Sequence, residues 1–186
     1  MFTDTHCHIL QEDYENPDAI IIKSLKSNIK RLVISGYDYR SNKEALNLAK
    51  KHENVYVTLG QHPSNLDNFS KNLNFVLQNI NHPKVIGIGE IGLDYHYGDK
   101  NKKEQIIGFK KMLKLSQKYK KPVIIHTRDA NQDTLKILSK YKTSGIVHSF
   151  SDSLETAKKY INIGYSLGIN GILTFKNSDL KDVLKM

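Results

Sequence analysis

The sequence is poor in cysteine and has no long apolar segment. Its single cysteine, Cys7, cannot form an internal disulfide, which agrees with a reducing compartment. No apolar run approaches the roughly 20 residues that a membrane-spanning helix needs. The N-terminal residues MFTDTHCHIL also lack the basic region and the apolar core of a secretory signal. We therefore expect a cytoplasmic protein with no membrane partner.

Acidic residues are few relative to basic ones. The chain has 28 Lys and Arg but 19 Asp and Glu, which gives a formal net charge of +9. A surplus of this size favours an anionic partner such as nucleic acid or a phosphorylated metabolite. The alternative explanation is compositional bias, because Lys, Asn and Ile are abundant throughout. The densest basic stretch, 100–121, has its lysines at the spacing of a solvated helix face.

Apolar strand patterns alternate with helical patterns along the chain. At 186 residues we expect one domain, spanning 1–186, that buries roughly 70% of its unfolded surface. Continuous apolar strands separated by helical segments predict an all-parallel sheet. The expected strands span 1–4, 31–35, 55–59, 85–94, 122–126, 145–148 and 164–169.

Two helix starts have recognisable caps. Asn16 and Pro17 predict a helix with proline in its first turn. The segment Ser41-Asn42-Lys43-Glu44 has the pattern of a capping box, which predicts a helix that begins there and ends near Lys51. Both starts fall between expected strands, in agreement with the alternation.

The positions of polar residues favour one of two parallel architectures. An open doubly wound sheet gathers its site at one crevice, whereas a barrel collects residues from the ends of many strands on one rim. Here polar candidates follow the first, third, fourth, fifth and sixth strands. We therefore expect an α/β fold, a TIM-type (β/α)8 barrel of the metal-dependent hydrolase kind, with about seven of its eight strands in this chain.

Glu90 follows the apolar and glycyl run VIGIG, in a segment that reads as the interior of a strand. A buried carboxylate needs a cation, either a metal or an arginine. Several histidines also follow apolar strand patterns, and they favour a metal as this cation. Four histidines with one glutamate favour Zn, Mn, Ni or Fe and suit Mg less well. The predicted metal ligands are His6, His8, Glu90, His126 and His148.

Alternation in the first strand supports this set. Residues two apart in an extended segment point to the same side. His6 and His8 can therefore chelate one ion while Cys7 packs on the other side.

Two further residues are candidate substrate contacts. His62 lies in the loop after the third strand, where a hydrogen-bonded structural role is the more ordinary explanation. Arg128, beside His126, is a candidate phosphate clamp through its bidentate guanidinium. An ion pair with Asp129 or another carboxylate is the equally ordinary explanation.

The glycines Gly87, Gly89 and Gly92 spell GxGxxG, the dinucleotide-binding pattern. In that motif the last glycine opens a helix, but LDYHYGD follows here, and Glu90 would repel a pyrophosphate. The preferred interpretation is that the glycines let neighbouring backbone or a ligand approach the strand.

Four motifs together resemble the TatD family of metal-dependent deoxyribonucleases, which belongs to the amidohydrolase-like barrels. They occur in the family's order, and the resemblance extends from the first residue to the last. The motifs are DTHCHI at 4–9, GEIGLDYH at 89–96, PVIIHTRDA at 122–130 and GIVHSFSDS at 145–153.

The resemblance implies a role for each predicted ligand. His6, His8 and Glu90 would bind one divalent ion, and Glu90 would bridge to a second ion held by His126 and His148. The implied cofactors are two divalent metal ions, with Zn, Mn, Ni, Fe and Mg as candidates. The implied reaction is hydrolysis of phosphodiester bonds by a metal-activated water, with DNA as substrate.

Two departures from the family pattern matter. Ser64 stands where the family usually has a second histidine in the loop after the third strand, which weakens a substrate contact there. Family members also continue through an eighth strand, whose end supplies an aspartate that usually binds metal. The resemblance therefore implies a barrel that is incomplete at the C-terminus, low turnover, and self-association through its open edges.

Two alternative functions remain open. The same metals polarise other centres, so the substrate is alternatively an aminoacyl-tRNA ester or a small phosphoester. The non-enzymatic alternative is a catalytically impaired fragment that binds metal or nucleic acid only.

Overall fold

The computed structural model describes residues 1–98, 100–178 and 180–185. Strands and helices alternate along the whole of this part of the chain. The elements are β1 (Phe2–Cys7), α1 (Pro17–Lys26), β2 (Ile29–Ser35), α2 (Tyr39–Lys51), β3 (Val55–Gln61), α3 (Phe69–Asn79), β4 (Val85–Asp94), α4 (Lys102–Tyr119), β5 (Val123–Arg128), α5 (Asn131–Leu138), β6 (Gly145–Val147), α6 (Leu154–Asn162), β7 (Tyr165–Leu167), the 3-10 helix η1 (Gly171–Thr174) and α7 (Leu180–Val183).

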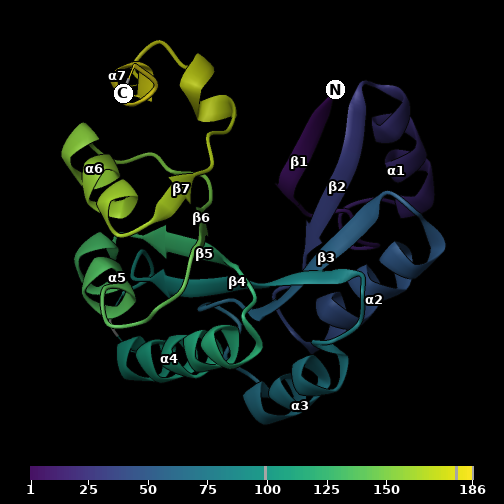
Figure 1. The fold of residues 1–186 in the computed structure, drawn as a ribbon, viewed down its shortest axis with the longest axis horizontal. Helices are drawn as coiled ribbons and strands as arrows, with labels where there is room; N and C mark the ends of the chain where they lie inside the picture. The colour runs from purple at the N-terminus through teal and green to yellow at the C-terminus, as the bar shows by residue number, and fades with distance from the viewer. Residues whose placement is uncertain (99, 179, 186) are drawn as a thin grey trace.

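The seven strands form one sheet in sequence order, from β1 to β7, and every neighbouring pair is parallel. The sheet curls, with the helices α1 to α6 around its outside (Figure 1). This arrangement confirms the predicted α/β fold of the TIM type. All strand C-termini point to one rim, which is where such folds place their functional residues.

Apolar strand residues form the core between the sheet and its helices. Val57, Leu59, Ile88, Ile125 and Val147 are fully buried. They come from four neighbouring strands, as expected for parallel strands covered by helices. The core therefore lies along the middle of the sheet and holds β3 to β6 in place.

The glycines of β4 let its neighbours approach closely, as the sequence indicated. Gly92 pairs with His126 of β5 and has φ +151°, which favours glycine. A Cβ at this position would lie 1.8 Å from the carbonyl oxygen of His126. Because β4 continues to Asp94, no helix follows the last glycine and the dinucleotide interpretation is wrong.

The two predicted helix starts have different outcomes. The Asn16 side chain accepts the backbone N–H of Ala19, and Pro17 opens α1 as predicted. Helix α2 begins two residues before Ser41, because Asp38 is its N-cap and accepts the backbone N–H of Ser41 at 2.8 Å. The capping box therefore joins Asp38 and Ser41 instead of Ser41 and Glu44.

Several element ends also differ from the sequence-based ranges. Strand β1 extends to Cys7, beyond the expected end at residue 4, whereas β7 is shorter than the expected 164–169. In the part of the chain that the structure describes, no helix is long and apolar enough to span a membrane.

Candidate metal centre

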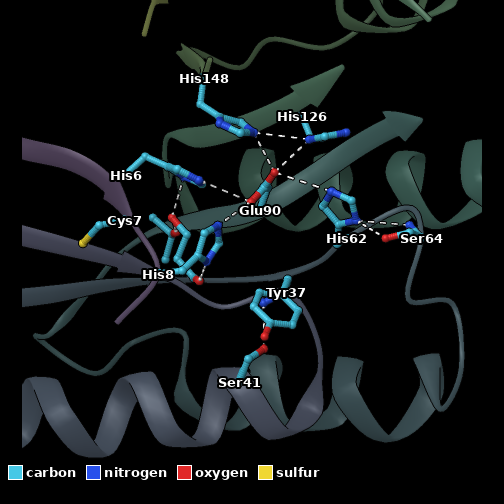
Figure 2. Close-up of polar contacts among 12 residues, drawn as sticks. His6, Cys7, His8, Tyr37, Ser41, His62, Ser64, Glu90, His126 and His148 are labelled. Carbon is cyan, nitrogen blue, oxygen red and sulfur yellow. Dashed lines mark hydrogen bonds and ion pairs between the residues drawn. The ribbon is translucent and has the colours of Figure 1, made fainter. Parts of the chain in front are cut away.

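Five side chains from four strands or their ends meet near the C-terminal rim of the sheet (Figure 2). His6 lies in β1 and His8 directly follows it, while Glu90 and His126 lie in β4 and β5. His148 directly follows β6. Their approach is a consequence of the parallel sheet, since it brings the carboxyl ends of all strands to one side.

Glu90 is the common neighbour of the four imidazoles. Its Oε1 lies 2.6 Å from His148 Nε2 and 2.9 Å from His126 Nδ1. Its Oε2 lies 3.3 Å from His8 Nε2 and 3.4 Å from His6 Nε2. Each carboxylate oxygen therefore faces its own pair of ring nitrogens.

Burial and hydrogen bonding oppose each other at Glu90, which is 3% exposed. Burial alone would raise the pKa of this carboxyl, but hydrogen bonds from His126, His148 and His8 outweigh it. They hold the pKa of Glu90 well below its usual range. The group is therefore an anion at neutral pH and lies deep in the site.

The imidazoles around Glu90 differ in protonation. Burial, followed by repulsion from His148, lowers the pKa of His6 to about 3. Burial would also lower the pKa of His8 and of His126, but the hydrogen bond and the charge of Glu90 raise both above the usual value. His6 is thus neutral, whereas protonated His8 and His126 are stabilised by hydrogen bonds to the Glu90 anion.

The donor set fits divalent cations. The ligand atoms of His6, His8 and Glu90 lie within 4.8 Å of one another, as do those of Glu90, His126 and His148. Each group offers two imidazole nitrogens and one carboxylate oxygen, which suits Zn, Mn, Fe or Ni better than Mg. The side chains therefore form two adjoining candidate sites that share Glu90, and their role as ligands stays a prediction.

Cys7 points away from this cluster, as the alternation predicts. Its thiol donates to the carbonyl oxygen of Val33 at 3.4 Å, and burial raises its pKa further above the usual value. A protonated thiol on the other side of β1 is not a ligand of this centre.

Asp94 also borders the centre, although the sequence did not single it out. Its Oδ2 lies 3.1 Å from His126 Nε2, and it is 7% exposed. Residues an even number of positions apart in a strand point to the same side, so the spacing of residues 90 and 94 could have indicated that Asp94 faces the centre. Together with His62, Asp94 and His126 form a third group of donor atoms within 4.8 Å of one another.

The two candidate substrate residues have different surroundings. His62 Nε2 lies 3.6 Å from Glu90 Oε1, and its ring packs edge-on against His126 with centroids 4.2 Å apart. Arg128 is exposed at the end of β5 and lines a cavity of about 390 Å³ with His96 and Asp129. Among the described residues Arg128 forms no ion pair, because Asp129 contacts His96 at 2.9 Å instead.

A model of the family described as TatD related DNase matches residues 3–186. The chain belongs to the TatD family. This membership agrees with the four sequence motifs that carried the resemblance.

Two curated relatives match nearly the whole of this chain and about three quarters of their own length. The chain is 31% identical over 191 residues to the uncharacterized metal-dependent hydrolase YabD of Bacillus subtilis, covering 100% of this chain and 75% of that protein. It is also 31% identical to the uncharacterized metal-dependent hydrolase YcfH of Escherichia coli, covering 98% of this chain and 71% of that protein.

Solved TatD structures have the same fold. YjjV, a TatD homologue from Escherichia coli, matches with a TM-score of 0.85 and 28% identity, over 98% of this chain and 73% of that one. A TatD-family hydrolase from Entamoeba histolytica matches with a TM-score of 0.77 over 90% of this chain and 64% of that one; at 24% identity this similarity concerns the fold.

Proposed function

We propose that this chain is a divalent-metal-dependent hydrolase that cleaves phosphodiester bonds in DNA. The observation that carries the proposal is the placement of the buried Glu90 carboxylate between two pairs of imidazole nitrogens. A carboxylate shared in this way is the arrangement expected of a bridging ligand in a two-metal site. Membership of the TatD-related DNase family supports the choice of DNA.

The proposed ligands divide between two cations. His6 and His8 would hold one cation together with Glu90 Oε2, and His126 and His148 would hold the other together with Oε1. Such cations, when bound, activate a water for attack and stabilise charge on the phosphoryl oxygens. The role of the protein is to fix their spacing, because both imidazole pairs contact the same carboxylate.

Positive charge near the rim favours a phosphodiester over a neutral substrate. Arg128 is exposed at the end of β5, two residues after His126, where its guanidinium lies over the Tyr97 ring at 5.8 Å. Among the described residues it has no ion-pair partner, so a phosphate could still accept from it in bidentate geometry. The net charge of +9 favours approach of a polyanion to the whole molecule.

A nuclease assay tests the proposal. The purified chain would be incubated with single-stranded and double-stranded DNA in Mn, Mg or Zn, beside a chelated control. We expect metal-dependent cleavage that Glu90→Gln abolishes, because the variant keeps the side-chain size and removes the shared charge. Circular dichroism would show that the variant keeps its fold.

Two outcomes would contradict the proposed cleavage of DNA. Intact DNA with metal bound, together with turnover of an aminoacyl-tRNA ester or a small phosphoester, would reassign the substrate. Metal bound without turnover of any of these substrates would contradict the enzymatic proposal.

A further inference from the structure

Two of the proposed ligand histidines are fixed by hydrogen-bond acceptors on the side of the ring facing away from Glu90. His8 Nδ1 donates to the carbonyl oxygen of Ser35 at 3.0 Å, and His126 Nε2 donates to Asp94 Oδ2 at 3.1 Å. When either ring gives up the proton that it donates to Glu90, its remaining proton stays on the nitrogen held by this acceptor. The lone pair then faces Glu90, which is the arrangement typical of metal-binding histidines.

His62 has the opposite arrangement. The backbone N–H of Ser64 donates to its Nδ1 at 3.2 Å, and Ser64 Oγ lies 2.6 Å from the same nitrogen (Figure 2). A backbone N–H can only donate, so Nδ1 is an acceptor. An imidazolium carries a proton on both nitrogens, so a ring whose Nδ1 accepts a hydrogen bond is neutral. The proton of the neutral ring must then reside on Nε2.

This Nε2–H points into the centre. It lies 3.6 Å from Glu90 Oε1, which is beyond hydrogen-bond distance. Within residues 1–98, 100–178 and 180–185 we find no hydrogen-bond acceptor for it. The side chain is 16% exposed, so this donor is accessible to a ligand that supplies an acceptor.

We propose that His62 is no metal ligand but the neutral hydrogen-bond donor to a phosphoryl oxygen bound at the centre, and that Ser64 is the positioning residue that keeps the proton on Nε2. The inference rests on the proposed function for the phosphoryl nature of the ligand. It assigns no ion to the group of His62, Asp94 and His126. It also gives Ser64 a role at the position where the family usually has a histidine.

The proton position is measured by long-range ¹H–¹⁵N correlation spectra of the imidazoles. We expect His62 in the Nε2–H form in the unmodified protein. His82 is an internal reference, because the backbone N–H of Lys84 donates to its Nδ1 at 3.1 Å in the same way. Ser64→Asp should move the proton of His62 to Nδ1, since a carboxylate can only accept. Ser64→Ala should leave it on Nε2, because the backbone N–H remains.

Metal and phosphate binding test the role of the donor. The protein would be loaded with Mn and titrated with inorganic phosphate, and metal content would be counted in parallel. We expect His62→Ala to retain its metal and to bind phosphate about tenfold or more weakly, as for a lost hydrogen bond to a charged group. His62→Gln, which keeps an N–H donor, should recover part of the affinity. Ser64→Asp should weaken phosphate binding, and His82→Ala should change neither property.

Three results would overturn the inference. Loss of a metal ion from His62→Ala would make His62 a ligand. Unchanged phosphate affinity in that variant would remove the donor role. An Nδ1–H spectrum for His62 in the unmodified protein would remove the role of Ser64. None of these readouts requires turnover, so the proposed nuclease activity can fail while His62-dependent phosphate binding persists.

Discussion

Asp94 Oδ2 lies 3.1 Å from His126 Nε2, on the side of the imidazole opposite to Glu90. The other oxygen of Asp94 accepts the backbone N–H of His96 at 2.9 Å. Its backbone is fixed as well, because its N–H donates to Gln105 Oε1 and its carbonyl accepts from Gln105 Nε2. The first turn of α4 therefore holds the end of β4, and Asp94 holds the ring of His126.

Removal of the Asp94 charge should weaken metal binding. We expect Asp94→Ala to reduce affinity for Mn or Zn by about 10- to 100-fold, as is typical for a carboxylate behind a ligand histidine. Asp94→Asn should have a smaller effect, because its amide oxygen can still accept from Nε2. Isothermal titration would measure both. The control is Asp133→Asn, which alters a carboxylate that contacts Tyr95 and Lys102. Equal affinities in all three variants would contradict the role of Asp94.

The sequence predicted the sheet because its strands are continuous apolar runs, and it predicted the convergence at Glu90 because parallel strands share one carboxyl-terminal edge. Sequence patterns could not predict contacts between segments that are distant along the chain. Glu44 looked like the partner in a capping box, but its carboxylate accepts the backbone N–H of Gln11 at 2.6 Å. That contact exists only after the loop behind β1 packs against α2. For the same reason Ser64 was interpreted only as a missing histidine, although its backbone N–H donates to His62 Nδ1.

Metal binding should weaken as the pH falls. The Glu90 hydrogen bond and charge raise the pKa of His8 and of His126 above the usual 6.5, in spite of burial. At pH 6.5 each ring is therefore protonated for more than half of the time in the metal-free protein, whereas His6, with a pKa of about 3, is neutral. A cation must displace these protons, so its binding should release about one to two protons at this pH. Affinity should rise with pH until both rings are neutral.

Titrations at pH 6.5 in buffers of different ionisation enthalpy would count these protons. His62→Gln is the control, because burial lowers the pKa of His62 to about 4, so its ring is already neutral at pH 6.5 and has no second proton to release. Metal binding without proton release at pH 6.5 would show that His8 and His126 are neutral in the free protein.

A side chain at Gly92 should be strongly destabilising. The Cβ of Gly92→Ala would lie 1.8 Å from the carbonyl oxygen of His126, and φ is +151°. Either β5 moves or the backbone of β4 changes, so we expect a loss of about 2 kcal/mol or more in unfolding free energy. Chemical denaturation would measure it. Gly171→Ala is the control, because a Cβ there meets nothing within 4 Å. Similar losses of unfolding free energy in both variants would show that the close approach of β5 does not cause the destabilisation.

The outer edges of β1 and β7 have no strand partner within the described residues. Unpaired strand edges present free N–H and C=O groups and tend to pair with other chains. On β1 the side chain of Phe2 is 68% exposed. The β1 edge therefore combines free backbone groups with an exposed aromatic side chain.

We expect this chain to self-associate through the β1 edge, and Phe2→Lys to reduce the association. A charge on an edge strand opposes pairing, because a second strand would have to bury it. Light scattering over a concentration series would measure the mean mass of both proteins. Ile107→Lys is the matched control, since Ile107 is 55% exposed but lies on α4. It should leave the mass unchanged. A monomer at all concentrations would contradict the expectation, and an equal effect of both substitutions would place the contact elsewhere than β1.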